Sequence, residues 1–479
     1  MKLTFWGAAR QVTGSMFLLE TDDEYRILID CGTDLRREYN DPNFASFYDQ
    51  TAGIFPFDPS LINLVVLTHA HIDHSGNIPN LVREGYEGQI LSTAPTFALS
   101  QLLLIDSANL HRKRLAQLNG TNKERKRLEK SGIDIKEMYN ENNAEESFER
   151  FVTLQFKQRF KVKPGLYITL IPAGHLLGAG YVLVENEENG KVTKVGFSGD
   201  IGRYNYPLLP DPEPMPEVDY LICESTYGSR NHTDSGDPVD ILEDIIRKRC
   251  VDIPGRLIIP SFSVGRTQAL LFTLNRLWAE KSFPPVKVFA DSPLAVQSTK
   301  VYEKYVNRLN SEAQGFYGEH GNLFDFRNLH YVENMKQSKA VANHNEACII
   351  ISSSGMISGG RVEYHVRQNI SNPYSTILMV GYSAEGTLGH QLMQGEKSVT
   401  FGGKEMSVGA TIARTDIFSG HGDRRDLMRF IKQQNPEKVK AIFLVHGEEN
   451  SMGEFREGIL AEGYGRVEIP AKGDTYELD

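Results

Sequence analysis

The sequence is poor in cysteine, in long apolar runs and in anything that resembles a leader. Its 479 residues include four cysteines, Cys31, Cys223, Cys250 and Cys348, which lie far apart and match no zinc-finger spacing. We therefore expect reduced thiols in the core of a cytoplasmic protein rather than a disulfide framework. No stretch approaches the roughly 20 apolar residues that span a bilayer. The opening MKLTFWGAARQVTG lacks the apolar centre of a signal peptide, so we expect no membrane contact.

Positive charge is also scarce overall. Lys and Arg number 52 against 62 Asp and Glu, which gives a net charge of -10. A protein that coats nucleic acid by electrostatics alone is usually basic, so this mode of binding is disfavoured. The local exception is residues 111–130, where eight Lys and Arg face two Glu. We interpret this run as a solvated helical excursion, and a position near a nucleic-acid path is the alternative.

The length predicts two or three folding units, and the pattern of elements changes along the chain. In the first 200 or so residues, short strands are expected at 26–29, 61–67, 166–171, 192–197 and 220–223. Each of them leads into a His or a carboxylate, at the strand ends where sites are built. From about Asp234, strands at 256–259, 286–290, 347–351 and 376–380 alternate with helices such as 238–250 and 266–280. This alternation predicts a parallel sheet covered on both faces, before short strands return at 406–413 and 438–445.

The strongest motif follows the strand at 61–67 and reads Thr-His69-Ala-His71-Ile-Asp73-His74. Alternation sends His69 and His71 to one side, while Asp73 and His74 can reach a second position. Imidazole and carboxylate both suit zinc, and two metals about 3.5–4 Å apart can share a bridging hydroxide.

Three more residues are weak signals when they are taken singly. His175, Asp200 and His446 each follow a predicted strand, where a His or an Asp is more often a cap or turn residue. They gain weight because the first motif lacks a third imidazole for one metal and a bridging carboxylate for the pair. His446 would complete the second metal.

Together these residues resemble a known family. The series Asp30, His69-x-His71-x-Asp73-His74, His175, Asp200 resembles the metallo-β-lactamase superfamily. The segments Glu224-Ser-Thr-Tyr-Gly, Ser-Gly-His421-Gly-Asp and Val-His446-Gly-Glu look like the three extra motifs of its β-CASP branch, which holds nucleases of RNA and DNA. The resemblance runs from Gly7 to the C-terminus. It implies an α/β protein, with a metallo-β-lactamase αββα sandwich in residues 1–215 and 405–479 and an inserted β-CASP domain in residues 216–404, a parallel sheet flanked by helices.

The resemblance also implies a role for each residue. His69, His71 and His175 would hold one zinc ion, Asp73, His74 and His446 would hold the other, and Asp200 would bridge the two. Asp30 would orient ligands. His421 would be the general acid and Glu224 would tune it, and Asp73 is expected to serve catalysis as well as metal binding. A histidine at the third extra motif, here His446, points to RNA, because DNA-acting members carry an aliphatic residue there.

The sequence therefore predicts an endoribonuclease that cuts single-stranded RNA with two zinc ions per chain. The ions would neutralise the phosphodiester and lower the pKa of a water to supply hydroxide. A 5′-3′ exoribonuclease of the same family is the first alternative, but that group usually carries a further C-terminal domain, whereas this chain stops about thirty residues after His446. A thioesterase- or lactonase-like hydrolase is the second, and room for a whole domain between Asp200 and His446 counts against it. A non-catalytic RNA-binding homologue would have lost ligands, and none is lost here.

Weaker expectations concern RNA contacts and assembly. Ser261, Ser263 and Arg266 precede or open the helix at 266–280. Plain helix capping is the favoured role for them, and contact with an RNA phosphate at the helix N-terminus is the alternative. A homodimer is left open.

Overall fold

The computed structural model describes residues 1–35, 55–119, 138–383 and 386–479, which form two compact units. The first unit contains Met1–Tyr204, Pro212–Asn231 and His421–Asp479, and the second contains Asn205–Asp211 and His232–Gly420. The two segments of the second unit therefore interrupt the chain of the first at two places. Most of the basic run predicted at 111–130 lies outside the described residues.

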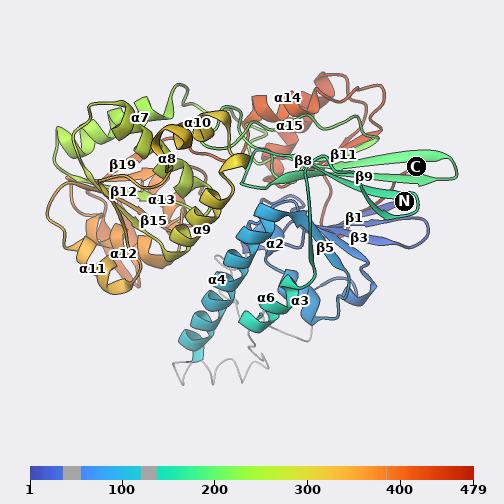
Figure 1. Cartoon of the computed structure of the whole chain (residues 1–479), viewed down its shortest axis with the longest axis horizontal. Coiled ribbons are helices and arrows are strands. Elements are labelled where there is room, and N and C mark those ends of the chain that lie inside the picture. Colours follow the sequence, from blue (N-terminus) through green and yellow to red (C-terminus); the bar gives the residue numbers. More distant parts are fainter. Residues whose placement is uncertain (36–54, 120–137, 384–385) are drawn as a thin grey trace. The chain divides into compact units, whose positions relative to one another are not determined.

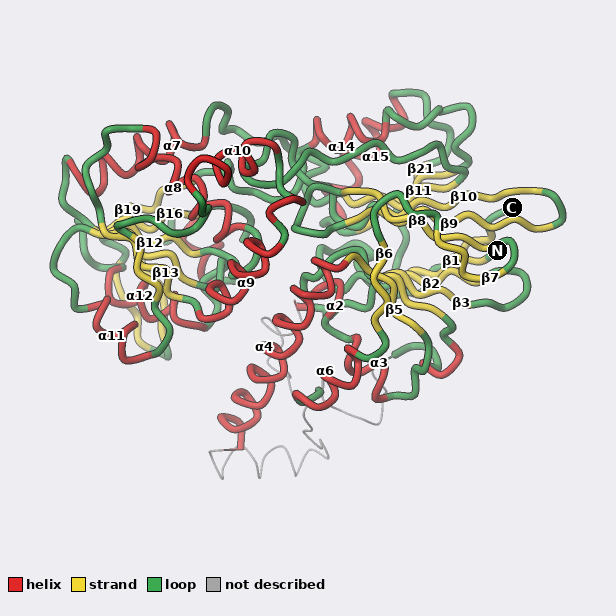
Figure 2. The backbone as a smooth tube through the Cα atoms, in the orientation of Figure 1, coloured by secondary structure: helices red, strands yellow, loops and turns green. Residues whose placement is uncertain are grey.

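Two seven-stranded sheets build the first unit (Figures 1 and 2). In spatial order, the first sheet contains β22 (Thr475–Glu477), β1 (Lys2–Phe5), β2 (Phe17–Glu20), β3 (Arg26–Ile29), β4 (Leu64–Val66), β5 (Gln89–Thr93) and β6 (Phe151–Leu154). The second contains β21 (Val467–Glu468), β20 (Ala441–Val445), β11 (Tyr220–Glu224), β10 (Lys191–Phe197), β9 (Gly180–Glu188), β8 (Leu166–Pro172) and β7 (Phe160–Lys163).

The sheets pack face to face through apolar side chains that alternate along the strands. Phe5 of the first sheet lies 5.3 Å from Phe443 of the second, between ring centroids, and Phe17 lies 6.3 Å from Phe197. Helices cover the outer faces (Figure 2). They are α2 (Ile72–Ser75), α3 (Ile78–Arg83), α4 (Ala94–Asn119) and α6 (Glu141–Phe148) beside the first sheet, and α14 (Arg424–Ile431) and α15 (Glu449–Ala461) beside the second. The result is the predicted αββα sandwich.

The strand directions explain where a site forms. Strands β3 and β4 run parallel, and so do β10, β11 and β20. Strand β8 pairs antiparallel with β9, which pairs antiparallel with β10, so β8 points the same way as β10. In each sheet, the loops that follow these strands therefore leave at one edge, where polar side chains gather.

The second unit has a six-stranded sheet with only parallel pairs. Its order is β14 (Leu329–Tyr331), β13 (Lys287–Asp291), β15 (Cys348–Ser352), β12 (Arg256–Pro260), β16 (Ser375–Met379) and β19 (Thr411–Arg414). The helices are α7 (Pro238–Ile246), α8 (Arg266–Glu280), α9 (Pro293–Lys304), α10 (Ser311–His320), α11 (Met335–Ala342), α12 (Gly360–Asn369) and α13 (Leu388–Met393). Figure 1 shows α7, α8 and α10 on the opposite side of this sheet from α11 and α12. The α/β class is confirmed.

Short elements complete the described part of the chain, and two expectations are corrected. They are η3 (Pro59–Leu61), η4 (Arg247–Val251), η5 (Val306–Arg308) and the hairpin of β17 (Ser398–Phe401) and β18 (Lys404–Ser407). The single strand predicted at 406–413 is wrong. Residues there divide between β18, which pairs with β17, and β19, which joins β16 in the six-stranded sheet. The helix predicted at 238–250 ends at Ile246 and continues as η4. The domain limits predicted at 215/216 and 404/405 stay a prediction.

All four cysteines are free and buried, as predicted. Burial raises the pKa of the Cys31 and Cys223 thiols well above the ordinary value, so these groups stay protonated and pack as small apolar side chains. A search of the described helices finds none that is long and apolar enough to cross a membrane.

Candidate metal centre

Seven of the predicted site residues meet in the first unit as two groups of metal-ligand atoms. His69, His71, His175 and Asp200 each offer one such atom, and these atoms all lie within 4.8 Å of one another. Asp73, His74 and His446 form the second group by the same measure. These are the groups that the resemblance assigns to two metals, and their roles as ligands stay a prediction.

The backbone bends sharply to bring these side chains to the sheet edge. Asp30 and His446 directly follow β3 and β20, and both adopt left-handed backbone angles, with φ of 59° and 51°. Such angles are uncommon for residues other than glycine and tend to persist at functional sites, where the surroundings hold them. Here His446 is held by its own N–H, which donates to the Ala8 carbonyl at 2.7 Å.

Asp200 lies between the two groups. Its Oδ2 is 3.5 Å from His69 Nε2 and 3.4 Å from His175 Nε2, while its Oδ1 is 3.2 Å from His74 Nε2 and 3.7 Å from His446 Nε2. Its Oδ1 is buried and has no hydrogen-bond partner among the described residues. A buried carboxylate oxygen without a partner is costly unless positive charge faces it, so the arrangement suits bound cations.

The negative charge around His74 also indicates that the arrangement suits bound cations. Burial would lower the pKa of this imidazole, but Asp200 and Asp30 outweigh burial and raise the pKa well above its ordinary value. A proton there supplies the positive charge that a metal would otherwise bring. By contrast, burial and neighbouring imidazoles lower the pKa of His69 well below the ordinary value, and His71 falls to about 4. A neutral imidazole is the form that binds metals.

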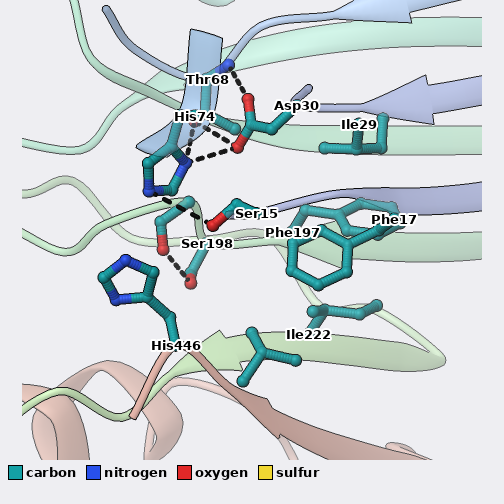
Figure 3. A pocket seen from close by; sticks show the side chains of 12 residues that line it. Ser15, Phe17, Ile29, Asp30, Thr68, His74, Phe197, Ser198, Ile222 and His446 are labelled. Carbon is teal, nitrogen blue, oxygen red and sulfur yellow. Dashed lines mark hydrogen bonds and ion pairs between the residues drawn. The ribbon is translucent and has the colours of Figure 1, made fainter. Parts of the chain in front are cut away.

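Asp30 holds the first motif in place through three hydrogen bonds to its carboxylate. Its Oδ2 accepts hydrogen bonds from His74 Nδ1 at 2.7 Å and from the Thr68 hydroxyl at 2.8 Å, and its Oδ1 accepts the Thr68 N–H at 2.8 Å. These contacts hold the ring of His74, which fits the orienting role expected for Asp30. Figure 3 shows them at the wall of a small cavity between the sheets, with Phe17 and Phe197 on its apolar side and His446 facing Ser198.

His421 and Glu224 form a pair beside the first group. His421 Nδ1 lies 3.1 Å from Glu224 Oε1, and its Nε2 is 3.9 Å from Asp200 Oδ2. Burial would lower the pKa of His421, but Glu224 and Asp200 raise it to about 9. Both oxygens of Glu224 are already used, because Oε1 accepts the Ile201 N–H at 2.6 Å and Oε2 accepts the Thr226 hydroxyl at 2.6 Å. The trio Asp200, Glu224 and His421 is therefore better suited to hold a proton than a third metal.

Sequence reasoning missed several residues at this edge. The Thr226 hydroxyl lies between Glu224 and His446, the Thr68 hydroxyl contacts His69 and Asp30, and Ser15 Oγ lies 3.4 Å from His74 Nε2. Thr68 and Thr226 stand inside the quoted motifs, so their position was the available signal. Nothing in the sequence marks Ser15.

The three candidate RNA contacts belong to the second unit. Arg266 opens α8, its Nε donates to the Phe418 carbonyl at 3.2 Å, and its guanidinium lies 4.8 Å from the Phe262 ring. Ser263 Oγ is 3.0 Å from Ser292 Oγ, and Ser261 Oγ accepts the Thr267 hydroxyl at 3.1 Å. The N-cap residue of α8 is Gly265, and its N–H donates to the Gln268 side chain, so neither serine caps this helix.

Comparisons with known proteins agree with this geometry. Residues 18–195 match the model of a metallo-beta-lactamase superfamily domain, residues 267–392 match a Beta-Casp domain, and residues 405–470 match a Zn-dependent metallo-hydrolase RNA specificity domain.

Three curated relatives resemble nearly the whole chain. Ribonuclease TTHA0252 of Thermus thermophilus is 30% identical over 94% of this chain and 94% of its own length. Transcription termination factor FttA of Methanosarcina mazei is 28% identical over 94% of this chain and 67% of its own length. An RNase J-like protein of Methanocaldococcus jannaschii is 28% identical, over 93% and 92% respectively.

Among solved structures, a protein of unknown function from Enterococcus faecalis superposes with a TM-score of 0.55 at 14% identity. The match covers 100% of this chain and 99% of the other. At that identity, the likeness concerns the fold alone.

Proposed function

We propose, because this chain belongs to the β-CASP ribonucleases of the metallo-β-lactamase superfamily, that it is a zinc-dependent endoribonuclease acting on single-stranded RNA. The family makes the protein a metal-dependent hydrolase of RNA. The observation that carries the finer proposal is Asp200, which turns one buried oxygen toward each group of imidazoles. We infer from it two zinc ions, one held by His69, His71 and His175 and one by Asp73, His74 and His446, with Asp200 between them.

When bound, two zinc ions would neutralise charge on the phosphate and activate a water. The chain supplies the rest of the chemistry. The leaving 3′-oxygen needs a proton, and His421 is placed to donate one from Nε2, while Nδ1 stays bonded to Glu224. Glu224 stabilises the imidazolium form of His421 and fixes the direction of its ring. Asp30 and Thr68 keep the imidazoles of the first motif in place.

The names of the relatives support RNA as substrate. Two of them are called a ribonuclease and an RNase J-like protein, and the third is called a transcription termination factor. The model matched by residues 405–470 is described as an RNA specificity domain, and this range contains both His421 and His446. Internal cleavage, rather than cleavage from an end, stays the proposal drawn from the sequence.

The test is incubation with 5′-labelled single-stranded RNA and with DNA of the same sequence. We expect internal fragments from RNA alone, none in the presence of a chelator, and renewed cleavage when zinc is added back. Single nucleotides released from the 5′ end would show an exonuclease instead. Inert RNA together with hydrolysis of a thioester or lactone would favour a small-molecule hydrolase.

Arg266 is proposed to contact an RNA phosphate, with Ser261 and Ser263 beside it. The guanidinium of Arg266 packs against Gly381, where any larger side chain would collide with it. This close packing restricts the positions that the guanidinium can take. Hydrogen bonds to charged groups contribute about 1.5–3 kcal/mol. Arg266→Ala should therefore raise KM for RNA by about 10- to 100-fold, leave kcat within a few-fold and reduce the salt slope of binding by about one.

Steady-state kinetics and binding at several salt concentrations measure these effects. Lys300→Ala, which removes an exposed cation from α9, is the matched control and should change neither quantity. An unchanged KM in Arg266→Ala would remove Arg266 from the RNA path.

The cellular location and the oligomeric state are also proposed. The reduced, buried thiols support a cytoplasmic location, which cell fractionation tests. A homodimer stays a prediction, and light scattering of the purified protein tests it.

A further inference from the structure

The hydroxyl of Thr226 joins two parts of the site that have separate roles. Thr226 Oγ1 lies 2.6 Å from Glu224 Oε2 and 3.0 Å from His446 Nδ1. Glu224 holds the general-acid candidate through its other oxygen, at 3.1 Å from His421 Nδ1. His446 turns its Nε2 toward Asp73 and Asp200. One hydroxyl therefore stands between the acid pair and a metal-ligand candidate.

The direction of these hydrogen bonds follows from the number of protons. Thr226 has a single hydroxyl proton, and its candidate acceptors are Glu224 Oε2 at 2.6 Å, His446 Nδ1 at 3.0 Å and the His446 carbonyl at 3.1 Å. The carboxylate is closer, and charge-assisted bonds are the stronger ones, so the proton goes to Glu224. A threonine oxygen that donates to Glu224 accepts a hydrogen from His446 Nδ1. His446 is then the Nδ1–H tautomer, and its Nε2 carries the lone pair.

We propose that Thr226 is a positioning residue, which fixes the tautomer and the ring direction of His446 for metal binding and ties that ligand to Glu224. The proposal rests on the two-metal function proposed above. A metal-binding histidine usually donates its second nitrogen to a carboxylate, a carbonyl or water. Here the carboxylate is reached through a hydroxyl, and it is the same carboxylate that holds His421.

The opposite sheet repeats this order of groups. Thr68 Oγ1 donates to Asp30 Oδ2 at 2.8 Å and lies 3.1 Å from His69 Nδ1. His69 Nε2 then faces Asp200 Oδ2 at 3.5 Å. A hydrogen-bonded chain of carboxylate, threonine hydroxyl and imidazole thus occurs once for each group of ligands. One chain lies at the ends of strands of the first sheet and the other at the ends of strands of the second. The repetition supports a shared physical reason, namely that each hydroxyl leaves the lone pair of Nε2 pointing into the site.

The test compares Thr226→Val with Thr226→Ser. Valine keeps the shape of threonine and removes the hydroxyl, whereas serine keeps the hydroxyl. Changes beside a ligand typically cost about 10- to 100-fold in metal affinity. We expect Thr226→Val to bind one of two zinc ions about 10- to 100-fold more weakly, with the other unchanged, and Thr226→Ser to bind both within a few-fold of the parent protein.

Zinc affinity is measured by competition with a chelator of known affinity, so the readout does not depend on RNA cleavage. Ser225→Ala is the matched control, because it removes a buried hydroxyl from the same loop. This hydroxyl donates to the Val445 carbonyl and not to Glu224 or the His446 ring. It should bind zinc as the parent does. Thr226→Ala tests the same loss with a smaller side chain in case valine impairs folding.

The outcomes separate this inference from the function beneath it. If the parent protein fails to bind two zinc ions, the two-metal function is wrong. If the parent binds two and Thr226→Val and Thr226→Ala bind both equally well, only the role of Thr226 is overturned. Equal losses in Thr226→Ser or in Ser225→Ala would also overturn it, because loop packing and not the hydroxyl would then explain the loss.

Discussion

Replacing His446 by alanine should remove one zinc ion and abolish RNA cleavage. The imidazole Nε2 of His446 lies 3.4 Å from Asp73 Oδ2 and 3.7 Å from Asp200 Oδ1, so it faces the carboxylate of its own group and the carboxylate between the two groups. Without it, only His74 would offer an imidazole nitrogen to that metal. Charge stabilisation by a catalytic metal contributes several kcal/mol to the transition state, which corresponds to a loss of more than about 10³-fold in kcat/KM.

Two measurements check this expectation together. Zinc per chain after dialysis should fall from two to one, and cleavage of labelled RNA should fall below detection. His330→Ala removes an exposed imidazole from the second unit and should change neither value. A His446→Ala protein with full activity or two tightly bound zinc ions would take His446 out of the metal centre.

The fold was readable from the sequence where the local pattern and the tertiary pairing agree. The helix predicted at 266–280 is α8, Arg266–Glu280, because Gly265 with its φ of 83° marks a clear start. The strand predicted at 61–67 shrinks to Leu64–Val66, since Pro59 opens a short turn of helix first. The strand at 406–413 was wrong because its two halves pair with different partners, and such pairing is decided far away in the sequence.

The site was readable only in part for a related reason. The first motif is dense enough to be noticed within six residues, and its members share one loop. His175 meets His71 at 3.2 Å across a separation of 104 residues, which spacing alone does not reveal. Thr226 reaches His446 because β11 runs parallel to β20 with Glu224 opposite Val445. That register depends on burial of both strands, so the motif marks Thr226 in the sequence but does not reveal that its hydroxyl contacts His446.

Replacing His421 by alanine should lower the rate of RNA cleavage strongly while both zinc ions stay bound. The variant therefore separates proton donation from metal binding. We expect both zinc ions to remain, because His421 Nε2 is 3.9 Å from Asp200 and its Nδ1 is already bonded to Glu224. Loss of a general acid costs about 10²- to 10⁴-fold in rate. Because Glu224 and Asp200 raise the pKa of His421 to about 9, this imidazole is protonated at neutral pH and loses its proton as the pH rises through about 9.

The variant should regain part of its rate when imidazole is added, since a free imidazolium can replace the missing donor at the leaving oxygen. The same addition should not rescue His446→Ala, in which a ligand and not a proton donor is gone. Zinc content, the rate constant and the response to imidazole together decide between the roles. A His421→Ala protein that loses zinc would make His421 a ligand, and the proton would then have to come from another group at this edge.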